Sequence, residues 1–223
     1  MKYKAIIFDM DGTIVTTEHI WGKSNELLLQ HYGIPYTDEM LQEIAPRVQG
    51  LSGHKSCQII IDIAQIPHSL VEVMDTQRMI AHKLYHDGIG FIDGFVDFQK
   101  KLVEHQVKHG IATNACDKTV AITDEKLNLK QFFGNHIYGV SCVGNVCKPD
   151  PAIFLHAAEQ LQVDPADCIV FEDSAHGVNA ARKAGMYCIG IATSPDKNQL
   201  RDAHRVIDTY HGLDVLTLRD EKV

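Results

Sequence analysis

The 223-residue chain has the composition of a soluble globular protein, with 45% hydrophobic and 22% charged residues, and its length suits one large domain or two modest ones. Its formal net charge of −8 disfavours nonspecific binding to nucleic acid, which depends on an excess of Lys and Arg. No apolar run is long enough for a signal peptide or a membrane span, and the six cysteines form no Cys-x-x-Cys pair that would indicate a zinc site. We therefore expect a cytoplasmic protein with no nucleic-acid or membrane partner, and its oligomeric state stays open.

The first predicted element is a buried strand over Ala5–Phe8, which leads directly into the segment Asp9–Thr13 (DMDGT). If the strand geometry continued, Asp9 and Asp11 would lie on the same side of the chain, because side chains repeat every second residue. Gly12 would let the backbone turn and approach a ligand closely. The segment is therefore either a polar turn that ends a strand or a pair of carboxylates presented for metal and phosphate chemistry.

Consecutive helices are predicted from about Glu18 to His86, because apolar residues recur there at helical spacing and no strong strand pattern interrupts them. Gly33–Pro35 breaks the first helix, and Thr37 can cap the second. Residues 50–53 and 66–69 carry the residue types of further turns.

After Gly88 the pattern changes to alternating helices and strands. The predicted elements, in chain order, are a helix over Phe95–Leu102, a strand over Val107–Thr113, a helix from Asp117, a strand over Ile137–Ser141, a helix opened by Asp150 and Pro151, a strand over Cys168–Phe171, a helix over His176–Gly185, a strand over Tyr187–Ala192 and a weak strand at Val206–Ile207. Strands separated by helices of this length imply right-handed crossovers and a parallel sheet. We predict an α/β fold with a Rossmann-like core formed by residues 1–15 and 88–223 and an all-helical insertion at residues 16–87.

Polar residues follow four strands of the predicted sheet. In a parallel sheet, ligands gather at the carboxyl ends of the strands. A strand end, a loop charge or a helix cap would explain each polar residue alone, but their joint occurrence favours a single site. The residues are Asp9 and Asp11, Thr113 and Asn114, Lys148, and Glu172 and Asp173.

The chain resembles phosphohydrolases of the haloacid dehalogenase superfamily, which also insert a helical cap after the first strand. Asp9–Thr13 matches the first motif of that superfamily, Thr113 the second, Lys148–Pro151 the third and Phe171–Ser174 the fourth. The chain is similar to the beta-phosphoglucomutase-like branch through the sequence Glu-Asp-Ser of the fourth motif, His176-Gly177 and the position of the cap. The resemblance covers essentially the whole chain.

The resemblance implies that Asp9 is a nucleophile, which attacks phosphorus and forms an aspartyl phosphate that water then hydrolyses. It implies that Asp11 protonates the leaving oxygen and then takes a proton from the attacking water. A free aspartic acid has a pKa of about 3.9, so Asp11 can act as an acid near neutral pH only in a site that favours its neutral form. A closing helical cap that excludes water would contribute to this.

A cation is expected because two carboxylates beside a phosphate group would otherwise repel it, and Mg²⁺ suits one or two carboxylates with phosphate oxygens and waters. We expect Asp9 and Asp173 to bind Mg²⁺ through their side chains, and the resemblance adds the backbone carbonyl of Asp11. Glu172 either binds the ion as well or lies behind its ligands.

The phosphoryl group is expected to meet donors from two other strand ends. Lys148 would keep Asp9 ionised and stabilise the phosphoryl oxygens. The Thr113 hydroxyl and the backbone amides of Asn114 and Ala115 would donate hydrogen bonds to the same oxygens.

Two residues of the helical insertion are candidates for contact with the substrate. Trp21 either packs within the cap or contacts the substrate, and Lys55 either enters the pocket from the cap loop or lies in solvent. We expect the substrate itself to be a small phosphorylated metabolite.

The predicted function is a Mg²⁺-dependent phosphatase acting on a sugar phosphate or a similar ester. The alternative within enzymes is a phosphomutase, although the mutases that this chain resembles carry an Arg where Gly53 falls and a His where Trp21 falls in an alignment without gaps. The alternative from another class is a receiver-like domain that accepts a phosphoryl group without turnover. An acidic pair on the first strand and an inserted cap disfavour a receiver.

Overall fold

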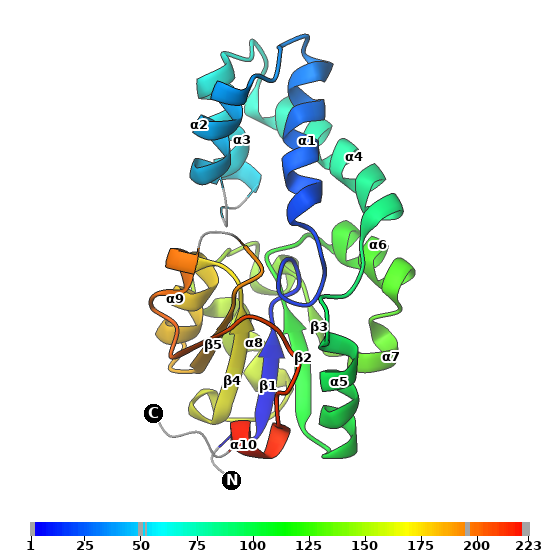
Figure 1. Cartoon of the computed structure of the whole chain (residues 1–223), viewed down its shortest axis with the longest axis vertical. Helices are drawn as coiled ribbons and strands as arrows, with labels where there is room; N and C mark the ends of the chain where they lie inside the picture. The colour runs from blue at the N-terminus through cyan, green and yellow to red at the C-terminus, as the bar shows by residue number, and fades with distance from the viewer. Residues whose placement is uncertain (1–2, 49–50, 52, 195–196, 220–223) are drawn as a thin grey trace. The chain divides into compact units, whose positions relative to one another are not determined.

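The computed structural model describes residues 3–48, 51, 53–194 and 197–219. The chain divides into two compact units, one formed by residues up to Thr16 and from Gly90 onward, and the other by Thr17–Ile89 (Figure 1). The second unit starts one residue later and ends two residues later than the helical insertion predicted at residues 16–87.

The described residues of the first unit form a six-stranded parallel sheet with the order β3-β2-β1-β4-β5-β6 (Figure 1). This confirms the predicted α/β fold with a parallel sheet. Within it Phe8, the last residue of β1, lies beside Ile111 of one neighbouring strand and Phe171 of the other. The strands are β1 (Ala5–Phe8), β2 (Lys108–Ala112), β3 (Ile137–Tyr138), β4 (Cys168–Glu172), β5 (Tyr187–Ile191) and β6 (Arg205–Ile207).

Helices cover both faces of this sheet. Ala5 and Ile7 belong to a core cluster with apolar residues of α8 and α9, whereas Phe8 packs against aromatic rings from α5 and α7. Since neighbouring residues of a strand point to opposite faces, β1 is buried on both sides. The helices of this unit are α5 (Phe95–Glu104), α6 (Asp117–Leu127), α7 (Lys130–Phe133), α8 (Ala152–Gln160), α9 (Ala175–Lys183) and α10 (Val215–Arg219), with 3₁₀ turns η1 (Val140–Val143), η2 (Pro165–Asp167) and η3 (Lys197–Leu200).

Several predicted bounds differ from the structure by one to three residues, and two differences have an identifiable local cause. The strand predicted at Ile137–Ser141 ends at Tyr138, because Gly139 leaves the ladder and the chain turns into η1. The helix expected to have Pro151 at its first position starts at Ala152 instead, with Pro151 as its N-cap. The carboxylate of Asp150 still accepts a hydrogen bond from the amide of Ala152, at 2.9 Å.

The second unit contains α1 (Glu18–His31), α2 (Asp38–Val48), α3 (Gly53–Ala64) and α4 (Leu70–Gly88) around its own apolar core. The hydroxyl of Thr37 accepts a hydrogen bond from the amide of Met40, at 3.3 Å, which confirms the predicted cap. Ser69 and Glu72 form a capping box at the start of α4. No helix of the described residues is both long enough and apolar enough to cross a membrane.

Candidate active site

Asp9 follows the last residue of β1 and is only 6% exposed. Its amide donates to the carbonyl of Phe171 at 3.0 Å, so the pairing of β1 with β4 continues to this residue. Its side chain meets Lys148, whose Nζ lies 2.5 Å from Asp9 Oδ1. The Asp9 carboxylate therefore lies at the carboxyl ends of the parallel strands, where it forms a buried ion pair with Lys148.

Lys148 also contacts Glu172, the last residue of β4, with 2.8 Å between Nζ and Oε1. The other oxygen of Glu172 accepts hydrogen bonds from the amide and the hydroxyl of Ser174, at 2.8 and 2.9 Å. The ammonium also lies 4.5 Å from the centre of the Phe154 ring, which adds a cation–π contact. These contacts fix Lys148 between two carboxylates and an aromatic face.

Burial raises the pKa of Asp9 to about 8, although the Lys148 ammonium opposes this rise and the carboxylates of Glu172 and Asp11 add to it. For Lys148 itself, burial lowers the pKa, but Asp9 and Glu172 outweigh burial and raise it above its usual value. Lys148 is therefore an ammonium ion at neutral pH, and Asp9 needs further positive charge to be fully ionised there.

Asp173 lies against the loop that follows β1. The hydroxyl of Thr13 donates to Asp173 Oδ1 at 2.9 Å. Gly12 has a φ of +79°, and a Cβ added to it would overlap the Asp173 carboxylate. Burial, and then the charges of Glu172 and Asp9, raise the pKa of Asp173 well above its usual value. A side chain at position 12 would thus displace the carboxylate predicted to bind metal.

Thr113, Asn114 and Ala115 follow β2 at the same edge of the sheet. The Thr113 hydroxyl accepts a hydrogen bond from the amide of Ala115 at 3.0 Å. The side chain of Asn114 accepts one from the amide of Lys148 at 2.9 Å. The structure thus brings this segment to the loop that carries Lys148, and the side chain of Asn114 ties the two together.

Asp9, Glu172 and Asp173 supply three carboxylates near the Lys148 ammonium, and both oxygens of Glu172 already bind Lys148 or Ser174. Of the two roles expected for Glu172, the geometry favours a place behind the ligands. Within the described part of the chain, no three His, Cys, Asp or Glu side chains form a group that could hold a metal ion. Mg²⁺ commonly needs only one or two protein carboxylates, so Asp9 and Asp173 suit it together with a backbone carbonyl.

The two candidates from the helical unit lie on different helices. Trp21, in α1, is 38% exposed and packs edge-on against Tyr85, with 6.2 Å between ring centres. Lys55, in α3, is exposed. Their contact with substrate stays a prediction.

Three residues near the site, Phe154, Thr193 and Tyr210, were not predicted from the sequence. Thr193 comes two residues after β5, and the rule that ligands gather at strand ends could have identified it. Phe154 belongs to an apolar helix, but its position beside Lys148 depends on how that helix packs. Tyr210 follows the last strand and belongs to none of the motifs.

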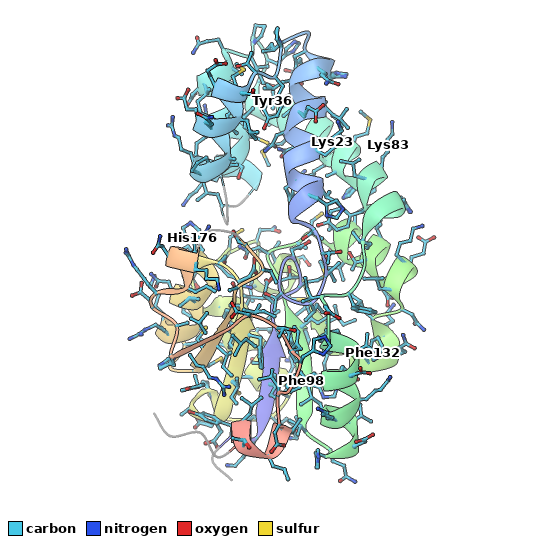
Figure 2. All side chains as sticks on the ribbon, in the orientation of Figure 1. Lys23, Tyr36, Lys83, Phe98, Phe132 and His176 are labelled. Carbon is cyan, nitrogen blue, oxygen red and sulfur yellow. The ribbon has the colours of Figure 1, made fainter. Side chains whose placement is uncertain are left out.

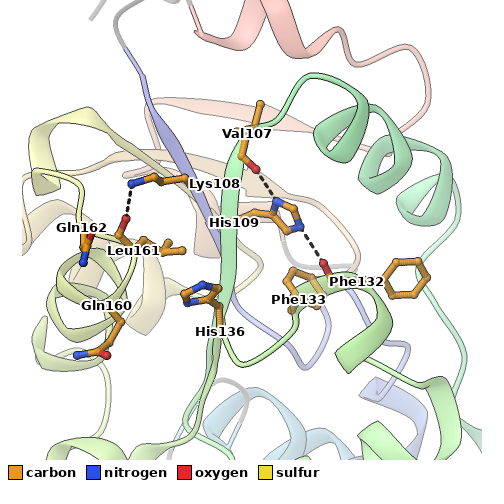
Figure 3. A pocket seen from close by; sticks show the side chains of 9 residues that line it. All are labelled: Val107, Lys108, His109, Phe132, Phe133, His136, Gln160, Leu161 and Gln162. Atoms are coloured by element: carbon orange, nitrogen blue, oxygen red, sulfur yellow. Dashed lines mark hydrogen bonds between the residues drawn. The ribbon is translucent and has the colours of Figure 1, made fainter.

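A pocket of about 500 Å³ lies at the opposite, amino end of β2, where Lys108 and His109 begin the strand (Figure 3). Lys108 donates to the carbonyl of Leu161 at 2.9 Å, and the two ring nitrogens of His109 lie 2.6 and 2.9 Å from the carbonyls of Val107 and Phe132. Because these polar groups already have backbone partners and lie at the other end of the strand from Thr113, the pocket is not part of the candidate site.

Comparisons with known proteins agree with the fold. The "Phosphorylated carbohydrates phosphatase" of Thermotoga maritima is 28% identical over 187 residues, which cover 82% of this chain and 82% of that protein. The beta-phosphoglucomutase of Bacillus subtilis is 26% identical over 197 residues, which cover 84% of this chain and 83% of that protein. A crystal structure of a haloacid dehalogenase-like protein of unknown function from Agrobacterium tumefaciens is 31% identical, with a TM-score of 0.77, and the match covers 93% of this chain and 94% of that one.

These comparisons confirm the predicted fold class and the prediction of an enzyme related to phosphoric monoester hydrolases. The sequence model of one family, the haloacid dehalogenase-like hydrolases, matches residues 6–191 and thus includes all four of the predicted motifs. The chain therefore belongs to the haloacid dehalogenase-like hydrolase family.

Proposed function

We propose that this protein is a Mg²⁺-dependent phosphatase that hydrolyses a small phosphorylated metabolite through an aspartyl phosphate. The observation that carries the proposal is the buried Lys148 ammonium, which lies between Asp9 and Glu172 at the carboxyl edge of the sheet, with Asp173 close by. This arrangement supplies a carboxylate nucleophile and a fixed positive charge at one place.

In the first step, a carboxylate oxygen of Asp9 attacks phosphorus, and the bond from phosphorus to the ester oxygen breaks. Asp11 donates a proton to the departing oxygen, which leaves as an alcohol. Lys148 stabilises the negative charge on the phosphoryl oxygens, and the Thr113 hydroxyl with the amides of Asn114 and Ala115 holds these oxygens in place. The product of this step is an aspartyl phosphate on Asp9.

In the second step, water attacks the phosphorus of the aspartyl phosphate, and Asp11 takes a proton from that water. The bond between phosphorus and the Asp9 oxygen breaks, inorganic phosphate leaves, and both carboxyl groups return to their starting states.

The charges of the site support a role for Mg²⁺. If ionised, Asp9, Glu172 and Asp173 would carry more negative charge than the Lys148 ammonium balances, and burial and this mutual repulsion raise the pKa of Asp9 and of Asp173. A phosphate ester would add more negative charge. We assign the metal to the side chains of Asp9 and Asp173 and to the backbone carbonyl of Asp11. When bound, Mg²⁺ would offset these charges and polarise a phosphoryl oxygen.

A phosphorylated carbohydrate or a related ester is the proposed substrate. The name of the Thermotoga maritima relative supports this class. The helical unit, residues 17–89, is proposed to act as the cap, with Trp21 and Lys55 as its candidate contacts to the substrate.

The test is phosphate release from a panel of phosphate esters by the purified protein, with Mg²⁺ or with excess chelator. Asp9→Asn should fold, because burial disfavours the charge that this change removes, but its turnover should fall by at least about three orders of magnitude. Acid quenching during turnover, followed by mass spectrometry, should find a phosphoryl group on the peptide that contains Asp9. Appreciable turnover by Asp9→Asn, or full activity in chelator, would contradict the proposal.

The same assays separate the alternatives. A phosphomutase would convert beta-glucose 1-phosphate to glucose 6-phosphate with little free phosphate when a trace of bisphosphate is present. The similarity to the beta-phosphoglucomutase of Bacillus subtilis supports a phosphomutase as the second candidate function. Against it, Gly53 has no side chain to hold a second phosphate. A receiver-like protein would release at most one equivalent of phosphate.

A further inference from the structure

Two side-chain hydroxyls that follow β5 hold the backbone of the loop after β1. Thr193 Oγ1 donates to the carbonyl of Gly12 at 2.6 Å. Tyr210 Oη donates to the carbonyl of Thr13 at 3.1 Å. Both donors lie beyond residues 6–191, where the family model matches. The two carbonyls belong to consecutive residues, so the loop is held at adjacent peptide groups.

The position of Tyr210 is fixed by its ring. Tyr210 is 1% exposed and packs against the rings of Phe8, Phe98 and Phe171, with 6.4, 5.5 and 5.5 Å between ring centres (Phe98 is labelled in Figure 2). Burial, and then the charges of Asp173 and Asp9, raise the pKa of Tyr210 well above its usual value. The hydroxyl therefore stays protonated, and it can donate a hydrogen bond to the carbonyl of Thr13.

The loop residues held in this way are the same ones that contact Asp173. Thr13 donates its hydroxyl to Asp173 at 2.9 Å. The Asp173 carboxylate occupies the space that a Cβ on Gly12 would need. A shift of the Gly12 or Thr13 peptide would therefore change the position of Asp173 relative to the loop.

We propose that Thr193 and Tyr210 are positioning residues for the metal site. Their two hydroxyls hold the peptide groups of Gly12 and Thr13, which directly follow Asp11 and contact Asp173. The inference rests on the proposed function, because it assigns Mg²⁺ to these groups. It predicts that loss of either hydroxyl weakens Mg²⁺ binding before it affects the chemistry at saturating metal.

The experiment compares wild type with Tyr210→Phe, which keeps the ring, and with Thr193→Val and Thr193→Ser, of which only the serine keeps a hydroxyl. The matched controls remove the same groups elsewhere. Tyr32→Phe removes a tyrosine hydroxyl that donates to Thr76 in the helical unit. Thr123→Val removes a buried threonine hydroxyl that donates to the carbonyl of Thr119 in α6.

Two readouts are measured against Mg²⁺ concentration, phosphate release and the rise in Tm that Mg²⁺ produces without substrate. Tyr210→Phe and Thr193→Val should each need about three- to tenfold more Mg²⁺ for the half-maximal effect in both readouts, as expected for the loss of one hydrogen bond. At saturating Mg²⁺, kcat should stay within about twofold of wild type. Thr193→Ser and the two controls should follow the wild-type curves.

Wild-type Mg²⁺ dependence in both hydroxyl-free variants would overturn the inference, as would a loss of kcat that added Mg²⁺ does not restore. If Tyr210→Phe fails to fold, the Mg²⁺ requirements of Thr193→Val and Thr193→Ser decide, and equal requirements in these two variants would overturn the inference. If wild type releases no phosphate from any ester, the proposed function fails, and the Tm readout still decides whether these hydroxyls support Mg²⁺ binding.

Discussion

Lys148 and Glu172 form an ion pair with 2.8 Å between Nζ and Oε1, and their side chains are only 2% and 1% exposed. Since Ser174 binds the other oxygen of Glu172, this carboxylate cannot turn toward another partner without losing hydrogen bonds. We infer that Glu172 acts on the chemistry by holding Lys148 in place beside Asp9.

Removal of Glu172 should therefore affect both stability and turnover. Glu172→Ala leaves a buried ammonium with one carboxylate partner fewer, and we expect the free energy of unfolding to fall by about 3 kcal/mol. Glu172→Gln keeps an acceptor for Lys148 and should cost less. Urea unfolding in chelator measures both values.

The Mg²⁺ requirement of Glu172→Gln tests the role of this residue directly. If Glu172 only positions Lys148, kcat should fall while the Mg²⁺ concentration for half-maximal activity stays within about twofold of wild type. A large rise in that concentration would instead identify Glu172 as a metal ligand.

Substitution of Asp173, unlike that of Glu172, should raise the Mg²⁺ requirement. Asp173→Asn removes a charged ligand of the proposed Mg²⁺ site, and we expect the half-maximal Mg²⁺ concentration to rise by at least about tenfold. Thr113→Ala is the comparison, because its hydroxyl contacts the amide of Ala115 and no residue of the metal set. Equal Mg²⁺ requirements in the two variants would remove Asp173 from the site. Ca²⁺ should inhibit wild type, since its larger and looser coordination does not enforce the same alignment.

Asp11 can be tested through the leaving group. Asp11→Asn cannot donate a proton to the departing oxygen, so alkyl phosphates, which leave as strongly basic alkoxides, should lose far more rate than aryl phosphates. The measurement is the single-turnover rate of aspartyl-phosphate formation for one ester of each kind. Equal losses for the two esters would argue against Asp11 as the acid.

The sign of the pH dependence follows from Asp9. Its pKa is raised to about 8 in the folded protein from a value of 3.8, so the folded state binds this proton more tightly than the unfolded chain does. In chelator, this stabilisation should be fully present below pH ~4 and should be lost as the pH rises through about 8. Urea unfolding of wild type at several pH values should show this decline, and Asp9→Asn should show a smaller one. An identical decline in the two proteins would contradict the assignment to Asp9.

Much of the fold was accessible from sequence because its signals are local. The apolar run Ala5–Phe8 and the run Cys168–Phe171 are buried on both faces, and both form strands at the predicted positions. The error at Ile137–Ser141 has a physical cause, since β3 is an edge strand with one partner and pairing, not composition, sets its length. Helix starts were also shifted, because Pro151 suits either the N-cap or the first turn.

The candidate site was accessible in part for the same reason. Asp9 and Lys148 are the first residues of recognisable motifs, and the rule that ligands gather at strand ends predicts both at one edge of the sheet. The contact partners of a side chain could not be predicted in this way. Whether the carboxylate of Glu172 turns toward a metal or toward Lys148 depends on contacts between segments 24 residues apart, and the hydroxyl of Tyr210 reaches a carbonyl 197 residues earlier. No local pattern encodes such pairs.

Gly177 and Gly22 provide a matched test of how tightly Glu172 is held. Both lie inside helices, Gly177 in α9 and Gly22 in α1. A Cβ added at Gly177 would overlap the carboxyl group of Glu172, whereas a Cβ at Gly22 would have nothing within 4 Å. In a helix interior, alanine is more favourable than glycine by about 1 kcal/mol. Gly22→Ala should therefore raise the free energy of unfolding by up to that amount.

Gly177→Ala has the same helical advantage but must displace Glu172, and we expect a net loss of about 1–3 kcal/mol, as for other overpacked sites. Turnover should fall as well, because the displaced carboxylate no longer holds Lys148. Urea unfolding and phosphate release at saturating Mg²⁺ measure the two effects. If Gly177→Ala were as stable and as active as Gly22→Ala, the Glu172 carboxylate would have room elsewhere, and its contact with Lys148 would not be needed for the reaction.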